Sequence, residues 1–182
     1  MNGWNPRCFE RGARFASIAA AAARFVDFAD WPSVAEIDRR LASDAGVRFV
    51  AADKGPGYEA RIALAGEVPT RVASWHDFLN ALVWASFPRA KRALTARLHA
   101  LATARGPGNR SRDEDFLALF DEGGVAIQGG SEIVFGHALF EHWLRDQRVS
   151  GLALELSAGP VDVLLADILS GPFAERTRRV AL

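Results

Sequence analysis

The sequence predicts an α+β fold in which a central kinked helix pair and further helices pack on small antiparallel β-hairpins. Apolar residues recur at helical spacing over residues 74–105, a proline interrupts this pattern at position 88, and short apolar runs elsewhere are separated by glycine-rich turns. The chain has 182 residues, of which 49% are hydrophobic. That length and composition predict a single globular domain covering residues 1–182.

The central helices are predicted from their ends. Ser74 can cap the first helix, and Asp77 follows three residues later, where an acid meets the positive end of the helix dipole. Pro88 cannot donate to the carbonyl four residues back, so the helix must kink or restart there, with Ser86 as the new cap. The second helix should end at residues 106–108, Gly-Pro-Gly. The apolar stripe of the first helix comprises Phe78, Leu79, Leu82, Val83 and Phe87.

The first 31 residues resemble a signal peptide only superficially. Alanine is weakly apolar, and the helical pattern continues without a clear cleavage site. We expect residues 1–31 to form an amphipathic helical segment packed on the body. Its buried face would hold Phe15, Ile18, Ala22, Phe25 and Val26. Ser33 and Glu36 form a candidate capping box for a short second helix.

Two hairpins are expected from strand-like composition. Residues 47–50 and 58–64 should pair around the turn at 55–57, Gly-Pro-Gly. Residues 116–120 and 125–128 should form the second hairpin, with Asp121 and Glu122 at its tip and an exposed loop before it at 110–115. The rest should form a helix from Gly130 or Ser131 to about Arg148, a strand over 152–156, a helix or strand over 161–169, and a solvated tail over 176–179.

One stretch of the central helices resembles a known family. The string W-H-D-x-x-N-A-L-x-W-x-x-F-P-x-x-K runs from Trp75 to Lys91 and is similar to the core motif of a bacterial family of uncharacterised proteins, domain of unknown function 3025. Residues 119–123 and 135–141 resemble two later motifs of that family, in the same order. The resemblance covers about residues 58 to 157. The resemblance implies a common family, but it does not imply an activity, a substrate or a cofactor.

A metal site is one hypothesis. His137 and Glu141 lie four residues apart on a predicted helix, so both side chains can reach one divalent metal ion. His76 or Asp77 could supply a third ligand if the central helix lies nearby, and Asp121 or Glu122 could act as a further ligand or as a general base. The alternative is that His137 and Glu141 form a hydrogen-bonded pair that fixes one helix to its neighbour. In that alternative Asp77 is only a capping partner and the two later acids belong to a turn.

A second hypothesis is a pocket that binds a small ligand without catalysing a reaction. His76, Asn80 and Trp84 follow one another at steps of four along one helix edge. Asn80 needs partners for both its oxygen and its nitrogen, so it could bind a facing backbone or a ligand. A small-ligand pocket lined by Trp84, Asn80 and Phe135 would fit this pattern. Lys91 and Arg92 are expected on a solvated face.

Composition and motifs argue against several functional classes of protein. Lys plus Arg and Asp plus Glu number 22 each, so no overall field draws the chain to nucleic acid or to an anionic membrane. No run approaches the about 20 apolar residues needed to span a bilayer. The single cysteine, Cys8, cannot form an internal disulfide, which favours the reducing cytoplasm. Phosphate-loop, dinucleotide and serine-hydrolase motifs are absent.

Three functions remain open: an interaction or structural domain, a small-ligand-binding protein, and a small metal-assisted hydrolase with a His/Glu/Asp cluster. A ββα nuclease is disfavoured because no histidine lies between residues 116 and 128. The sequence leaves substrate, partners and oligomeric state undetermined.

Overall fold

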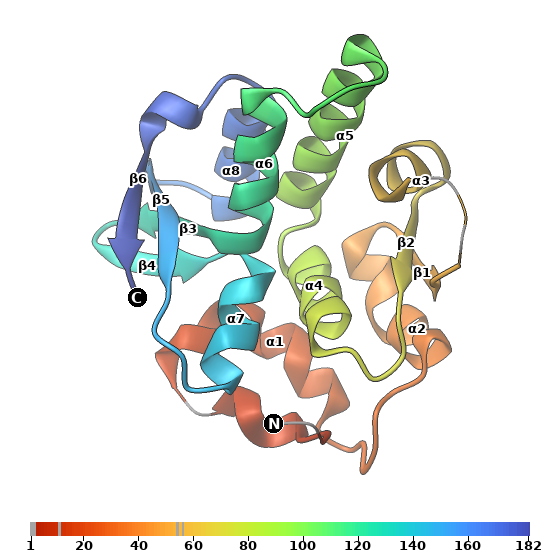
Figure 1. The fold of residues 1–182 in the computed structure, drawn as a ribbon. Coiled ribbons are helices and arrows are strands. Elements are labelled where there is room, and N and C mark those ends of the chain that lie inside the picture. The colour runs from red at the N-terminus through yellow and green to blue at the C-terminus, as the bar shows by residue number, and fades with distance from the viewer. Residues whose placement is uncertain (1–2, 11, 54, 56) are drawn as a thin grey trace.

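The computed structural model describes residues 3–10, 12–53, 55 and 57–182 and confirms the α+β fold class (Figure 1). The elements follow in this order: η1 (Pro6–Glu10), η2 (Ala13–Ile18), α1 (Ala19–Ala22), η3 (Ala23–Phe25), α2 (Val34–Ala45), β1 (Arg48–Ala51), α3 (Tyr58–Ala65), β2 (Glu67–Thr70), α4 (Trp75–Ser86), α5 (Pro88–Arg105), α6 (Arg112–Gly123), β3 (Gly124–Gln128), β4 (Ser131–Val134), α7 (His137–Leu144), β5 (Ser150–Leu156), α8 (Val161–Leu169), η4 (Ala174–Arg176) and β6 (Thr177–Ala181).

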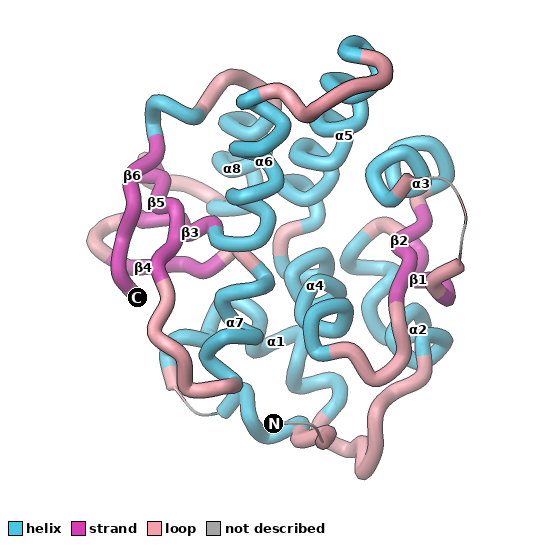
Figure 2. The backbone as a smooth tube through the Cα atoms, in the orientation of Figure 1, coloured by secondary structure: helices cyan, strands magenta, loops and turns pink. Residues whose placement is uncertain are grey.

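The strands gather on two sides of the central helices. Figure 2 shows β1 and β2 beside α2 and α3, and the four other strands on the opposite side of α4 and α5. β1 and β2 run parallel, whereas the larger sheet has the order β4-β3-β5-β6 and contains both parallel and antiparallel pairs. In the described part of the chain, no helix is both long enough and apolar enough to cross a bilayer.

The break between the central helices is confirmed. Ser74 accepts a hydrogen bond from the backbone N–H of Asp77 at 3.3 Å, α4 ends at Ser86, and α5 begins at Pro88. The predicted Ser86 cap is wrong. Asp162 of α8 instead accepts hydrogen bonds from the amides of Arg89 and Ala90. Pro88 has no N–H, so these amides are among the first that α5 offers, and its positive end favours a carboxylate.

The central helix α4 lies at the centre of the core. Its completely buried side chains belong to one apolar cluster that extends from Cys8 to Phe173. The α4 members that are 0–1% exposed are Phe78, Leu79, Ala81, Leu82, Val83 and Trp84. The helix is therefore enclosed on nearly all sides, and the polar groups at its first turn are held in a rigid frame.

The N-terminal segment differs from the predicted amphipathic helix. Over the described residues it consists of 3₁₀ turns around the single short helix α1; residues 1, 2 and 11 lie outside the described part. Phe15, Ile18, Ala22 and Phe25 are buried as expected, but Val26 is 48% exposed. Buried residues recur here mainly at steps of three, which is the repeat of a 3₁₀ helix rather than an α-helix.

The first predicted hairpin is wrong. Residues 58–65 form α3, and β1 pairs instead with β2, in parallel and with Phe49 opposite Val68. Alanines make this segment a good helix former, and Gly66 ends it with a left-handed conformation at φ 65°. Pro56, in the predicted turn, lies outside the described residues.

The second predicted hairpin is also wrong in its first strand. Residues 112–123 form α6, which removes both the predicted strand at 116–120 and most of the predicted loop at 110–115. The observed hairpin joins β3 to β4 through Gly129 and Gly130, both with positive φ. Asp121 and Glu122 consequently lie in the last turn of a helix rather than at a hairpin tip.

Two further corrections concern the C-terminal third. Residues 131–134 form a strand, so the helix expected from Gly130 or Ser131 begins only at His137. The strand over 152–156 is confirmed within β5, and 161–169 is a helix, α8. The expected solvated tail at 176–179 mostly forms β6, because its backbone pairs antiparallel with β5.

The start of α6 leads to a prediction about acid stability. Glu114 is 2% exposed, accepts the backbone N–H of Ser111 at 2.7 Å and pairs with Arg105 at 3.0 Å. The pKa of Glu114 is lowered from about 4.5 to about 2, mainly by the hydrogen bond from Arg105 and next by that from the Ser111 amide. A lowered folded-state pKa contributes stability above pH 4.5 that is lost as the pH falls towards 2. Glu114→Gln should therefore be less stable than wild type at pH 7, and the difference should shrink below pH 4.5.

Urea unfolding at a series of pH values from 7 to about 2.5 measures this difference. Glu132→Gln is the matched control, because Glu132 is an exposed carboxylate on β4. A stability difference for Glu114→Gln that stays constant across this range would contradict the assignment.

Candidate functional site

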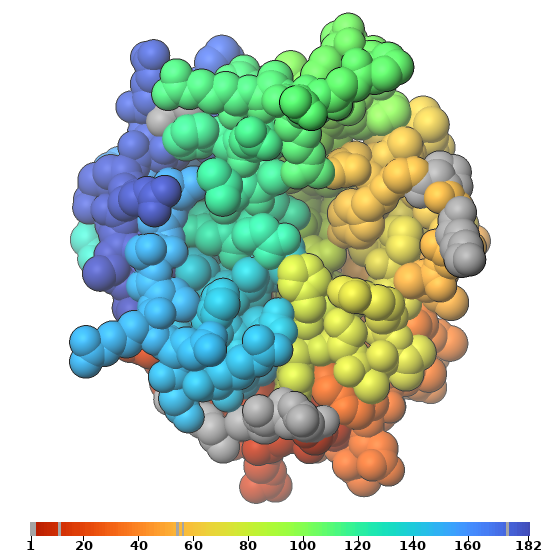
Figure 3. Space-filling model, viewed as in Figure 1, coloured from red at the N-terminus to blue at the C-terminus, as the bar shows by residue number. Residues whose placement is uncertain are grey.

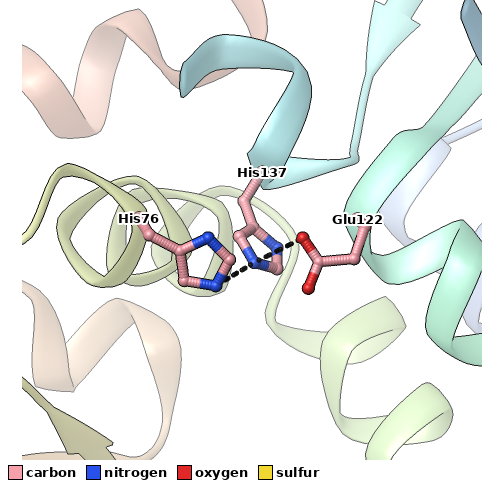
Figure 4. A group of neighbouring side chains, drawn as sticks. All are labelled: His76, Glu122 and His137. Atoms are coloured by element: carbon pink, nitrogen blue, oxygen red, sulfur yellow. Dashed lines mark hydrogen bonds and ion pairs between the residues drawn. The ribbon is translucent and has the colours of Figure 1, made fainter. Parts of the chain in front are cut away.

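Three helix ends converge at one point of the molecule. His76 lies in the first turn of α4, His137 is the first residue of α7, and Glu122 lies in the last turn of α6. Figure 4 shows the three side chains pointing toward one another from these separate helices. All three were candidates from the sequence, which gave no indication that they meet.

Two of the three separations between the possible ligand atoms fit a metal site. The Nε2 atoms of His76 and His137 are 3.2 Å apart, and Nε2 of His137 is 3.4 Å from Oε2 of Glu122. One ligand atom from each residue lies within 4.8 Å of the others. A tetrahedral zinc with bonds of 2.0–2.1 Å has ligand atoms about 3.3–3.4 Å apart. These two separations therefore match two edges of such a tetrahedron.

The backbone around Gly136 sets the distance between His137 and Glu122. The amides of Phe135 and Gly136 both donate to the carbonyl of Gly124, at 3.0 and 2.8 Å. A Cβ atom at Gly136 would lie 2.5 Å from the carbonyl oxygen of Glu122 and 2.5 Å from the amide of Gly124. Only glycine allows α7 to start this close to the end of α6. This close backbone approach lies just before the first residue of α7.

The environment of His137 favours the neutral imidazole that a metal ligand requires. His137 is 2% exposed, and burial lowers its pKa to about 3, with smaller contributions in the same direction from Lys91 and His76. Asp121 opposes this shift. The ring is therefore uncharged at neutral pH, and a lone pair is available to bind a cation.

Glu141 takes a different place from the one expected. Its Oε2 is 3.4 Å from Nδ1 of His76, on the ring edge opposite the Nε2 that approaches His137. Its other oxygen pairs with Arg145 at 2.6 Å. The described cluster of possible ligands does not include Glu141. A carboxylate on the far nitrogen of a histidine is the usual means of orienting a ligand ring, so Glu141 supports His76 rather than pairing with His137.

A buried ion pair adjoins the cluster and was missed in the sequence. Lys91 is 1% exposed, and its Nζ lies 2.5 Å from Oδ1 of Asp121 and 5.4 Å from the centre of the Trp84 ring. The expected solvated position of Lys91 is therefore wrong. The signal was present, because Lys91 occupies a core position between Phe87 and Leu94 on the apolar stripe of α5. Lys91 lowers the pKa of Asp121 against the opposing effect of burial.

The three residues of the cluster line a cleft of about 380 Å³. Figure 3 shows the surface hollowed between α3, α4 and α6, where this cleft lies. Its polar lining includes His76, Asn80, Asp121, Glu122 and His137. Apolar walls come from Pro69, Leu94, Leu98 and Ala118. A volume of this size accommodates a small molecule next to the three ligand atoms.

Tyr58 and Asn80 meet inside this cleft. Nδ2 of Asn80 donates to the hydroxyl of Tyr58 at 2.8 Å, and burial raises the pKa of Tyr58. Asn80 is 7% exposed, and its Oδ1 is buried without a partner among the described residues. Tyr58 was missed because it was assigned to a strand, whereas it is the first residue of α3.

The remaining candidates lie elsewhere. Trp84 and Phe135 are completely buried and do not line the cleft. Of the three residues expected to line a ligand pocket, only Asn80 lines the observed cleft. Asp77 lines the cleft, but its carboxylate binds Arg71 by both the backbone N–H, at 2.7 Å, and the guanidinium. Its role in the cap of Ser74 is carried by its own backbone amide.

Residues 47–133 match the family described as Protein of unknown function (DUF3025). This match covers slightly less than half of the 182 residues. The match confirms the resemblance, although it starts earlier than residue 58 and ends before residue 157. The DUF3025 segment contains His76, Asn80 and Glu122 but stops before His137. No curated protein and no solved structure matches the chain.

Proposed function

We propose that the chain is a metal-dependent hydrolase whose zinc ion is held by His76, Glu122 and His137. The observation that supports this proposal is the pair of separations between possible ligand atoms, 3.2 and 3.4 Å, among residues that line a cleft. Two imidazoles and one carboxylate form a ligand set found in catalytic zinc sites, where the fourth position holds water. All three residues line the cleft, so a metal ion held by them would be within reach of a molecule that binds there.

The neighbouring residues suit hydrolysis of an acyl bond. A bound zinc ion supplies a water of lowered pKa and polarises a carbonyl. Asp121 can take a proton from the water, because only its Oδ1 is used by Lys91 among the described residues. Tyr58 accepts a hydrogen bond from Asn80, so its own proton is available for the oxygen that becomes negative. The water oxygen bonds to the acyl carbon, the bond to the leaving group breaks, and the leaving group receives the proton.

Metal analysis of purified protein tests the proposal. We expect about one zinc per chain after reconstitution with zinc and dialysis, and zinc-dependent hydrolysis of 4-nitrophenyl acetate. His76→Ala should weaken zinc binding at least about tenfold, because it removes one of three ligands. His99→Ala is the matched control, since His99 lies on α5 away from the cleft lining. Equal zinc retention in the two variants, or equal hydrolysis without zinc, would refute the proposal.

A second candidate is small-molecule binding without catalysis. The unpartnered Oδ1 of Asn80 favours it, because a buried acceptor gains stability from a ligand that donates to it. A protein that lacks zinc and hydrolysis, yet is stabilised against heat by an amide such as acetamide, would support this second function. Loss of that stabilisation in Asn80→Leu would locate the ligand.

A further inference from the structure

Arg71 is a cation that lines the same cleft as the proposed zinc site. It lies between β2 and α4 and lines the same cleft as His76. Asp77 holds its guanidinium with two contacts, from Nε at 2.9 Å and from Nη2 at 2.8 Å. The same carboxylate accepts the backbone N–H of Arg71 at 2.7 Å. The side chain is thus fixed although 64% of it is exposed.

The contacts with Asp77 leave one edge of the guanidinium, the edge that carries Nη1, for a ligand. Nη1 of Arg71 has no hydrogen-bond partner among the described residues. An arginine that is already oriented loses little side-chain entropy when it binds an anion, and its planar donors fit a carboxylate. The second arginine of the cleft, Arg110, is weakly paired with Glu59 at 3.5 Å.

The charges of the residues around the cleft indicate the charge of an anion that Arg71 could bind. Four carboxylates line it, and they face two arginines. Lys91, which pairs with Asp121, and a divalent ion would add three positive charges, while Glu141 and Arg145 beside His76 cancel each other. Positive charges would then exceed negative ones by one. A group with a single negative charge balances this excess, whereas a phosphate dianion exceeds it. The lining carboxylates are Glu59, Asp77, Asp121 and Glu122.

We propose that Arg71 binds a substrate carboxylate, so that the preferred substrates are esters or amides whose acyl chain ends in a carboxylate. This inference rests on the proposed hydrolase function. Arg71 holds one end of the acyl chain, and the reacting carbonyl lies at His76, Glu122 and His137. The ratio of kcat/KM for a carboxylate-bearing ester to that for a neutral ester measures this contribution.

The test uses zinc-loaded protein and mono(4-nitrophenyl) esters of succinate, glutarate and adipate, with 4-nitrophenyl acetate as the neutral ester. The three chain lengths vary the distance between carboxylate and ester. We expect at least one half ester to be preferred over acetate. Arg71→Gln should lower that preference at least about tenfold, mainly through KM, and Arg71→Lys should lower it less. Arg178→Ala, which removes an exposed arginine paired with Glu155 on the larger sheet, should leave both rates unchanged.

Two results would overturn the inference. One is a half-ester preference in Arg71→Gln equal to that of wild type; the other is Arg71-dependent hydrolysis of 4-nitrophenyl phosphate without a preference for any half ester. Failure of the proposed hydrolase function can be distinguished from failure of this inference, because neither the half esters nor 4-nitrophenyl acetate would then be cleaved. In that case calorimetric titration with monomethyl glutarate against neutral dimethyl glutarate still decides the role of Arg71: loss of selective binding in Arg71→Gln supports it, and unchanged binding refutes it.

Discussion

Lys91→Met should lower the free energy of unfolding by about 3–5 kcal/mol, because removal of one partner leaves a buried charge uncompensated. Lys91 is 1% exposed, and the side chain of Asp121 is 16% exposed. Methionine has a similar volume to lysine, so lost packing contributes little. Urea unfolding at pH 7 measures the change.

A double variant separates the charge effect from a packing effect. Lys91→Met combined with Asp121→Leu removes both charges and should recover most of the lost stability, because buried ion pairs are often replaceable by apolar residues. Arg92→Met is the control on the same helix, since Arg92 is exposed. A double variant as unstable as Lys91→Met would show that the ion pair is not the cause.

Gly136→Ala should cost about 3 kcal/mol of stability and weaken zinc binding at least about tenfold, because the backbone must move to admit the methyl group. The added Cβ would lie 2.5 Å from the Glu122 carbonyl oxygen, a distance that backbone atoms do not tolerate. Relief of this clash moves the start of α7 away from the end of α6. The same movement separates His137 from Glu122. Urea unfolding and a competitive zinc titration measure the two effects.

Gly57→Ala is the matched control for this variant. Gly57 also precedes the first residue of a helix and also has negative φ, at −50°, but no atom lies within 4 Å of the position of its added Cβ. Its stability should change by less than about 0.5 kcal/mol. If Gly136→Ala proves as mild as Gly57→Ala, the close approach does not set the geometry of the site.

Local signals predicted the central helices correctly. The cap at Ser74, the break at Pro88 and the apolar stripe between them each depend on residues close in the sequence. The two predicted hairpins failed because residues 58–64 and 116–120 have compositions that suit either a strand or a helix. The capping box of Ser111 and Glu114 was present in the sequence and would have favoured a helix at the second of these.

The sequence named each residue of the present candidate cluster, but it paired His137 with Glu141 as metal ligands and could not show which residues meet. His76, Glu122 and His137 were each named, yet only tertiary packing brings the three helix ends together. The helical spacing of His137 and Glu141 was correct, but Glu141 contacts the far side of His76. Lys91 was missed as a site residue because charged side chains usually lie in solvent, whereas the exposed Arg71 was missed because its partner Asp77 was assigned to the helix cap. Their positions depend on carboxylates that were not assigned to them.

The DUF3025 segment ends at residue 133, a few residues before His137. A fragment cut at that boundary would keep His76 and Glu122 but lose the imidazole that lies between them. Two remaining ligands seldom retain zinc in competition with ordinary buffers, so such a fragment would be a poor subject for functional screening. The proposed zinc site therefore extends beyond the matched segment, and expression that tests this site should continue at least through α7.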